Sequence, residues 1–179
     1  TSRKLGKNTL LFAGSITIEN VLNKFDKKNI FIFVVFYCVC KGNSAYGGFS
    51  IGEIALHLLL EFKPKEIFIL GLDLALNQKT GATHYTGNTF GTSQINLDEE
   101  QDRSNFDIRS SLVKVKGNFI KEVYTTPIFY GSIKMLEDIV RRKDKSIKIY
   151  NLSKNGARFG GVIPKKTEQI DLKKYKDIY

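Results

Sequence analysis

The longest apolar run in the chain covers residues 30–40 and reads IFIFVVFYCVC. This run is too short to cross a bilayer as a helix, and its β-branched and aromatic side chains favour a strand buried on both faces. Such a strand belongs in a parallel sheet that is covered by helices. Cys38 and Cys40 lie in this apolar run, so we expect small buried hydrophobes rather than metal ligands.

Shorter apolar segments repeat an alternation of strand and helix along the chain. Residues 51–62 have apolar side chains three and four positions apart, which predicts a helix with one buried face. Residues 112–126 alternate around Gly117 and Asn118, which predicts a β-hairpin. The other expected elements are strands at 9–13, 29–37, 66–75 and 146–153 and helices at 19–25 and 127–142. The predicted buried face of the helix at 51–62 comprises Ile51, Ile54, Ala55, Leu58, Leu59 and Phe62.

This order of elements predicts the fold class and the domain organisation. We expect an α/β protein with an open, mostly parallel, Rossmann-like sheet, flanking helices and a β-hairpin excursion. We expect one domain over residues 1–164, whose N-terminal part lies upstream of Thr1, and a basic C-terminal tail over residues 165–179. The stretch from Thr1 lacks the apolar segment of a secretory signal, which favours a cytoplasmic protein.

The chain carries a formal net charge of +10 at pH 7. Excess positive charge favours anionic partners such as nucleotides, nucleic acid, acidic glycans or a membrane surface, or it serves solubility alone. The basic clusters at residues 141–143 and 173–176 lack the aromatic interleaving of a single-strand binder. We therefore read these clusters as solvated surfaces and expect neither a nucleic-acid partner nor a membrane span.

Small and polar residues follow several of the expected strands, and the carboxyl ends of parallel strands are where open sheets bind ligands. Gly47, Gly48 and Ser50 precede the helix at 51–62, whose free N–H groups and positive dipole end favour an anion such as phosphate. The alternative is that Ser50 only caps the helix and forms a capping box with Glu53, and both can hold together. The candidate binding residues at this edge are Gly47, Gly48, Ser50, Asn151 and Ser153.

Two ionisable residues are candidates for chemistry at the same edge. Asp73 closes an apolar strand, where it can hydrogen-bond a ribose, hold Mg²⁺ or orient a histidine, or else cap the following turn. His84 lies in the glycine-bounded loop GATHYTGNTFG, which makes it the best candidate for a general acid or base. The other histidine, His57, lies on an apolar helix and fits a packing or surface role.

Residues 76–110 form a long polar excursion, which is typical of functional or mobile loops. Its acidic stretch, LDEEQD at residues 97–102, lacks the spacing of a calcium loop, and the chain has no zinc-ligand pattern. We expect no metal site.

Three stretches taken in order resemble a known family. They are GGFSIGEIALHLLLEFKPKEIFILGLDLA at 47–75, GATHYTG at 81–87 and IYNLSKNGARFGGVIP at 149–164. In this order they resemble the motility accessory factor glycosyltransferases of flagellated bacteria. The central domain of that family is shared with archaeal pterin pyrophosphokinases and is related in fold to bacterial sialyltransferases. With TLLFAGSITIENVLNKF at 9–25, the likeness covers most of the chain.

The resemblance implies transfer of a nonulosonic acid, a sialic-like sugar such as pseudaminic acid, from a CMP-sugar to Ser or Thr of flagellin. It implies that Gly47, Gly48 and Ser50 hold the donor phosphate, that Asp73 supports the site and that His84 is the base. Asn151 and Ser153 would line the crevice. Such chemistry requires no cofactor beyond the CMP-sugar donor and no metal. In the related sialyltransferases the catalytic histidine closes an H-Y-x-G-H stretch, and here that position is Asn88.

Two other functions remain open at this point. One is Mg-ATP-dependent pyrophosphoryl transfer to a pterin, with Asp73 as the expected Mg²⁺ ligand. The other is a non-catalytic flagellin-binding fragment, which the absence of the family's Gly-Pro-Ser loop favours; here we find only Ala13-Gly14-Ser15, on a strand that we interpret as a later one of the domain.

Overall fold

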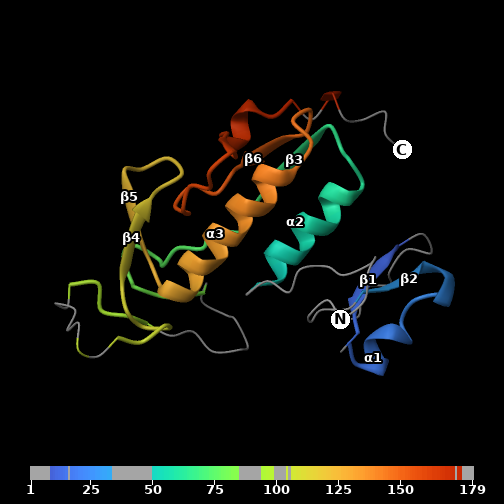
Figure 1. Cartoon of the computed structure of the whole chain (residues 1–179), viewed down its shortest axis with the longest axis horizontal. Helices are drawn as coiled ribbons and strands as arrows, with labels where there is room; N and C mark the ends of the chain where they lie inside the picture. The colour runs from blue at the N-terminus through green and yellow to red at the C-terminus, as the bar shows by residue number, and fades with distance from the viewer. Residues whose placement is uncertain are drawn as a thin grey trace. The chain divides into compact units, whose positions relative to one another are not determined.

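The computed structural model describes residues 9–15, 17–33, 50–84, 94–98, 104, 106–171 and 173–174 (Figure 1). Its contacts divide the chain into two compact units, Thr1–Gly47 and Gly48–Tyr179. The expectation of one domain over residues 1–164 stays a prediction. Gly47, Gly48, Cys38 and Cys40 lie outside the described residues. Within the described ranges, no helix has the length and apolar character needed to cross a bilayer.

The first unit contains two parallel strands joined through a short helix. Strand β1 (Leu11–Gly14) pairs in parallel with β2 (Ile30–Phe33), and the rings of Phe12 and Phe31 stack with centroids 5.2 Å apart. Between them lie α1 (Glu19–Leu22) and the 3₁₀ turn η1 (Lys27–Asn29). Helix α1 is shorter than the predicted 19–25, because the N–H groups of Lys24 and Phe25 bond three residues back in tight turns instead of continuing the α-helix.

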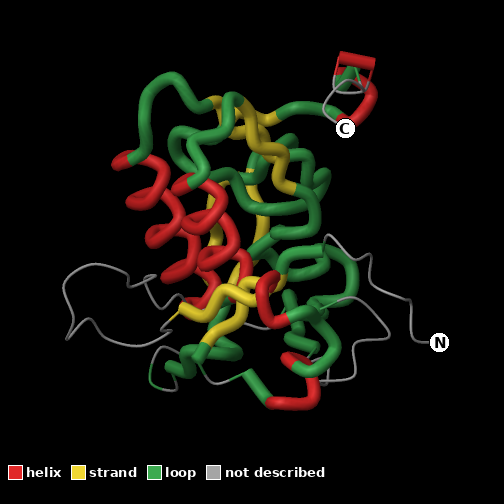
Figure 2. The backbone as a smooth tube through the Cα atoms, turned by 90° about the vertical axis from the view of Figure 1, so that its right-hand side faces the viewer, coloured by secondary structure: helices red, strands yellow, loops and turns green. Residues whose placement is uncertain are grey.

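The second unit is built on a parallel sheet in the order β3–β6–β7. Strand β3 (Glu66–Ile69) pairs with β6 (Lys148–Asn151), and β6 pairs with β7 (Ile163–Pro164). Helix α2 (Ile51–Glu61) leads into β3, and α3 (Pro127–Arg142) leads into β6. Figure 2 shows these two helices in red, side by side. Since each helix runs back along the strand it feeds, its N-terminus lies at the edge where β3 and β6 end.

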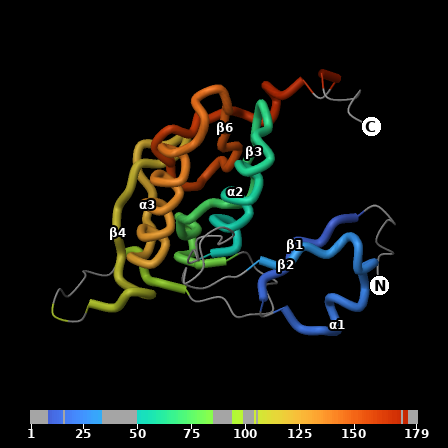
Figure 3. Tube along the Cα trace, turned by 45° about the vertical axis from the view of Figure 1, so that its right-hand side comes forward, coloured from blue at the N-terminus to red at the C-terminus, as the bar shows by residue number. Residues whose placement is uncertain are grey.

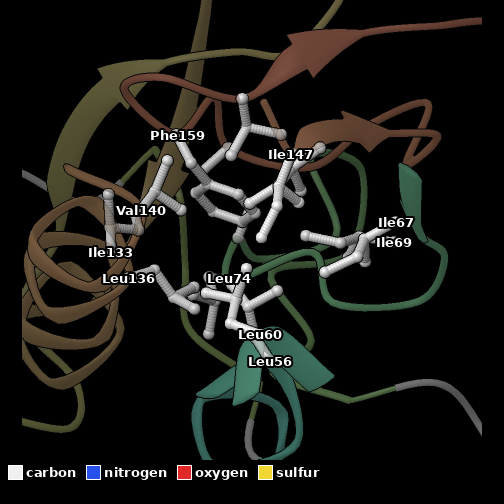
Figure 4. Close-up of a cluster of buried hydrophobic side chains, with 14 of the residues drawn as sticks. Leu56, Leu60, Ile67, Ile69, Leu74, Ile133, Leu136, Val140, Ile147 and Phe159 are labelled. Atoms are coloured by element: carbon white, nitrogen blue, oxygen red, sulfur yellow. The ribbon is translucent and has the colours of Figure 1, made fainter. Parts of the chain in front are cut away.

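The hydrophobic core lies between the two helices and one face of this sheet (Figure 4). The pairing of Ile67 with Ile149 sets the register and turns both side chains to the same face. The helices contribute fully buried side chains, among them Leu136, and Phe159 from the chain before β7 fills the centre. The main helical members of the core are Leu56, Leu60, Ile133, Leu136 and Val140.

The predicted buried face of α2 is wrong. Ile51, Leu59 and Phe62 are 77%, 47% and 63% exposed, and Ala55 is exposed as well. Of the predicted face only Ile54 is buried, and the side that meets the core carries Glu53, Leu56 and Leu60. The helix is apolar almost all round, so two faces satisfy the same spacing and local pattern alone cannot choose between them.

The opposite face of the sheet is half-exposed and carries an aromatic stack. The rings of Phe68 and Tyr150 lie 5.1 Å apart, and Lys165 Nζ lies 4.4 Å from the centre of the Tyr150 ring. Burial raises the pKa of the Tyr150 phenol, and the hydrogen bond it donates to Glu66 raises that pKa further. Lys174 forms an ion pair with Glu66 at 3.8 Å, so the C-terminal segment contacts this face of the sheet.

The predicted hairpin is confirmed as β4 (Val113–Lys116) and β5 (Glu122–Thr125), which pair antiparallel. Its β4 strand contacts α3 (Figure 3). Helix α3 has the predicted bounds, with Pro127 in its first turn and the Thr126 hydroxyl accepting from the Phe129 N–H at 3.4 Å. The structure is therefore an α/β protein with parallel and antiparallel strand pairs.

The strand predicted over residues 66–75 ends early, at Ile69. Gly71 and Leu74 have φ angles of +80° and +46°, which no β-strand accommodates. Asp73 therefore lies in the loop after β3 and not on the strand.

Replacing Leu136 by Ala is expected to lower the free energy of unfolding by about 2–5 kcal/mol, because the side chain is 0% exposed and its removal leaves a cavity between α3 and the sheet. Leu59→Ala on the exposed face of α2 is the control and should cost under about 1 kcal/mol. Equilibrium urea denaturation measures both. Equal losses would show that α2 buries the face predicted from the sequence.

Candidate functional site

The loops that follow β3 and β6 lie against each other at one edge of the parallel sheet. The N–H of Leu152 donates to Ile69 O at 2.9 Å, which carries the strand pairing one residue beyond β6. The N–H of Ala157 donates to Asp73 O at 2.8 Å. The predicted residues Asp73, Asn151 and Ser153 are thereby brought to the same edge, as the sequence analysis expected.

A buried polar cluster of Asn118, Asn151 and Ser153 fixes the loop after β6. The side-chain amide of Asn118 donates to the backbone oxygens of Asn151 at 3.1 Å and Ser153 at 2.9 Å. The Asn151 side chain donates to Ala157 O at 3.2 Å and accepts from the Ser153 N–H at 3.0 Å. Asn151 is 0% exposed, so its amide holds the loop in shape and is not open to solvent.

Two polar atoms of this cluster are buried without a hydrogen-bond partner among the described residues. They are Asn118 Oδ1 and Ser153 Oγ. Leaving a polar atom unsatisfied in this way costs about 1–3 kcal/mol, and native proteins retain few such atoms. Their location at the ligand-binding edge of a parallel sheet marks this cluster as the strongest site candidate in the described structure.

Gly156 lets the two loops approach. A Cβ atom at this position would lie 3.0 Å from both Cα and O of Asp73 and 3.0 Å from Cβ of Ser153. The Gly156 carbonyl accepts from the Asn118 N–H at 2.9 Å. The backbone of Asp73 is therefore held by the loop around Gly156, while its side chain is exposed. A carboxylate so placed is free to meet a ligand.

The N-terminus of α2 reaches the same edge. A Cβ at Gly52 would lie 2.5 Å from Leu72 Cδ1, so the first turn of α2 packs on the residue before Asp73. Ser50 is the N-cap, but the predicted capping box is not formed, because among the described residues its hydroxyl makes no hydrogen bond to an N–H of the first turn of α2. It donates instead to Glu53 Oε1 at 3.2 Å. The helix N-terminus is thus not capped by the Ser50 side chain, and a carboxylate, Glu53, is buried in its first turn.

His84 lies beside the first turn of α3. Its Nδ1 is 3.1 Å from Thr83 Oγ1, and its ring meets Phe129 edge-on with centroids 6.4 Å apart. The ring is exposed. A histidine there is accessible to a substrate hydroxyl, as a base must be. Within the described part of the chain no hydrogen bond joins it to Asp73.

Asn118 and Glu53 are buried at the candidate site, and the sequence analysis did not single them out as site residues. Asn118 follows Gly117 in a hairpin and had the pattern of an ordinary turn residue. Glu53 fitted a helix cap. The described residues contain no group of three or more His, Cys, Asp and Glu side chains suited to a metal ion. Comparison of the chain with protein-family models, curated proteins and solved structures finds no match.

Gly156→Ala is expected to lower the free energy of unfolding by about 1–3 kcal/mol, because the new methyl group presses on the Asp73 backbone. Gly160→Ala is the matched control: its Cβ would lie 3.1 Å from Glu137 Oε1, the end of a flexible side chain that can move. Thermal and urea unfolding measure the difference. If both variants lose the same stability, the loops are not tightly packed at Asp73.

Proposed function

We propose that this chain is a glycosyltransferase domain that transfers a nonulosonic acid, such as pseudaminic acid, from its CMP-sugar to Ser or Thr of flagellin in the bacterial cytoplasm. This would support flagellar assembly and motility. The sequence stretches at 47–75, 81–87 and 149–164 suggest the family. The structural observation that carries the proposal is the meeting of Asp73, Ser153 and the α2 N-terminus at one edge of the β3–β6 pair.

The proposed fold is the open, Rossmann-like sheet that the family resemblance implies. Two observations support it. Strands β1 and β2 pair in parallel in the first unit, and β3, β6 and β7 pair in parallel in the second. In the second unit α2 and α3 are crossover helices leading into parallel strands.

The proposed binding roles follow from the polarity of this edge. The α2 N-terminus, with Gly47, Gly48 and Ser50 before it, would receive the donor phosphate through backbone N–H groups. The exposed Asp73 carboxylate would hydrogen-bond hydroxyl groups of the donor. Ser153 would line the buried wall of the site. Asn151 would hold the loop that carries Ser153, because the Asn151 side-chain amide donates to Ala157 O and accepts from the Ser153 N–H. A net charge of +10 favours approach of an anionic donor.

The proposed reaction is an inverting displacement. The acceptor hydroxyl oxygen bonds to the anomeric carbon of the sugar while the bond from that carbon to the phosphate oxygen breaks, and the electron pair leaves with CMP. His84 takes the proton of the hydroxyl. The protein's share is to hold the phosphate as it gains negative charge and to shield the oxocarbenium-like centre.

Thermal unfolding with CMP, CMP-sialic acid, and ATP with and without Mg²⁺ tests the proposal. We expect stabilisation by the CMP compounds that a chelator leaves unchanged, about 2.7 kcal/mol at a ligand concentration a hundredfold above Kd. Stabilisation by Mg-ATP alone would favour pterin pyrophosphoryl transfer instead. Absence of any shift would favour a flagellin-binding fragment without chemistry.

His84→Gln is expected to reduce transfer from CMP-sialic acid to a flagellin acceptor by about 10²–10⁴-fold, because the hydroxyl proton loses its base. The Kd for CMP should stay within twofold, since the variant leaves the donor site intact. His57→Gln on α2 is the control and should transfer at the wild-type rate. Activity that survives in His84→Gln would assign the base to another group.

A further inference from the structure

Backbone hydrogen bonds connect the β4–β5 hairpin turn to the loop after β6, which carries Ser153. Gly117 forms an antiparallel bridge with Ala157, and the Arg158 N–H donates to Lys116 O at 2.8 Å. On the other side of this bridge the Asn118 N–H donates to Gly156 O at 2.9 Å. The hairpin is otherwise remote in sequence from β6, so these bonds tie two separate parts of the unit together.

Asn118 makes the largest share of this connection. Both hydrogens of its amide nitrogen are used, one for Asn151 O and one for Ser153 O. The alternative amide orientation would place Oδ1 against two carbonyl oxygens, so the donor pattern defines the orientation of the group. In this orientation Oδ1 is buried without a partner among the described residues. The side chain therefore keeps an unfavourable environment for one atom in order to hold two backbone oxygens.

The loop that Asn118 holds, residues 151–157, also contacts the backbone of Asp73. Gly156, whose carbonyl Asn118 binds, packs on the Asp73 backbone, and the next residue, Ala157, donates to Asp73 O. A single set of hydrogen bonds thus runs from the hairpin through residues 151–157 to the loop after β3.

We propose that Asn118 is a positioning residue that sets the place of Asp73 and Ser153 by locking the loop at 151–157 to the β4–β5 hairpin. This inference rests on the proposed function for its effect on CMP, while its effect on the loop is independent of any ligand. Loss of the Asn118 amide frees two buried carbonyl oxygens and loosens the support beneath Asp73.

The test compares Asn118→Ala with Ile147→Val, and uses amide hydrogen exchange together with CMP binding. Ile147 is buried directly before the start of β6, at the end of that strand away from the loop at 151–157, so its variant lowers stability without touching the loop. In Asn118→Ala we expect exchange of the Ala157 amide to accelerate at least tenfold and the Kd for CMP to rise at least tenfold. In Ile147→Val both should stay within twofold of wild type. Asn118→Asp replaces the donor by an acceptor of the same size. It is the second variant, measured if Asn118→Ala folds poorly, and we expect the same faster exchange at Ala157 and the same rise in the Kd for CMP.

Each result has a separate meaning. Unchanged exchange at Ala157 in both Asn118 variants, or equal acceleration in Ile147→Val, overturns the positioning role. Accelerated exchange with an unchanged Kd for CMP overturns the link between the loop and the donor site. If the wild-type chain does not bind CMP, the proposed function fails, and exchange at Ala157 still decides whether Asn118 locks the loop.

Discussion

The second unit depends on the parallel pairing of β3 with β6. Its register places Ile67 beside Ile149, so both turn to the face that α2 and α3 cover. A shift of one residue would turn this apolar set outward and expose it, which makes the register strongly specified. Parallel pairing also brings the carboxyl ends of both strands to one edge. One constraint therefore creates the core and the place where polar loops must meet.

At that edge the backbone groups beyond the strand ends no longer have partners in the sheet, so they need other hydrogen-bond partners. Here Ile69 O and Asp73 O accept from the opposite loop, and Asn118 satisfies two more carbonyl groups. Buried side-chain amides provide donors where the sheet no longer does. The backbone of Asp73 is held rigidly by the hydrogen-bond network, while its carboxylate is exposed to solvent. Binding sites benefit from such rigid support.

Sequence alone predicted the elements whose signals are local. Helix α3 followed from Pro127 at its start and from apolar spacing through Leu136, and the hairpin followed from strict alternation. The buried face of α2 was wrong, because a helix with Leu56 on one side and Leu59 on the other is apolar on both. Only tertiary packing selects between them. The predicted end of β3 was wrong because the chain takes positive φ at Gly71 and again at Leu74, and Leu74 has no intrinsic preference for that conformation, so the surrounding chain imposes it.

The candidate site likewise has one part that could be predicted from the sequence and one part that could not. The edge could be predicted because topology alone decides where parallel strands end, and Asp73 and Ser153 followed from being polar there. The role of Asn118 could not be predicted, since a glycine–asparagine pair in a hairpin satisfies turn chemistry on its own. Its importance arises from three donors directed at a loop more than thirty residues away. An asparagine that only made a turn would leave its side chain in water. This one is buried, with one oxygen that has no partner among the described residues, and that cost is explicable if the loop it holds must keep one shape.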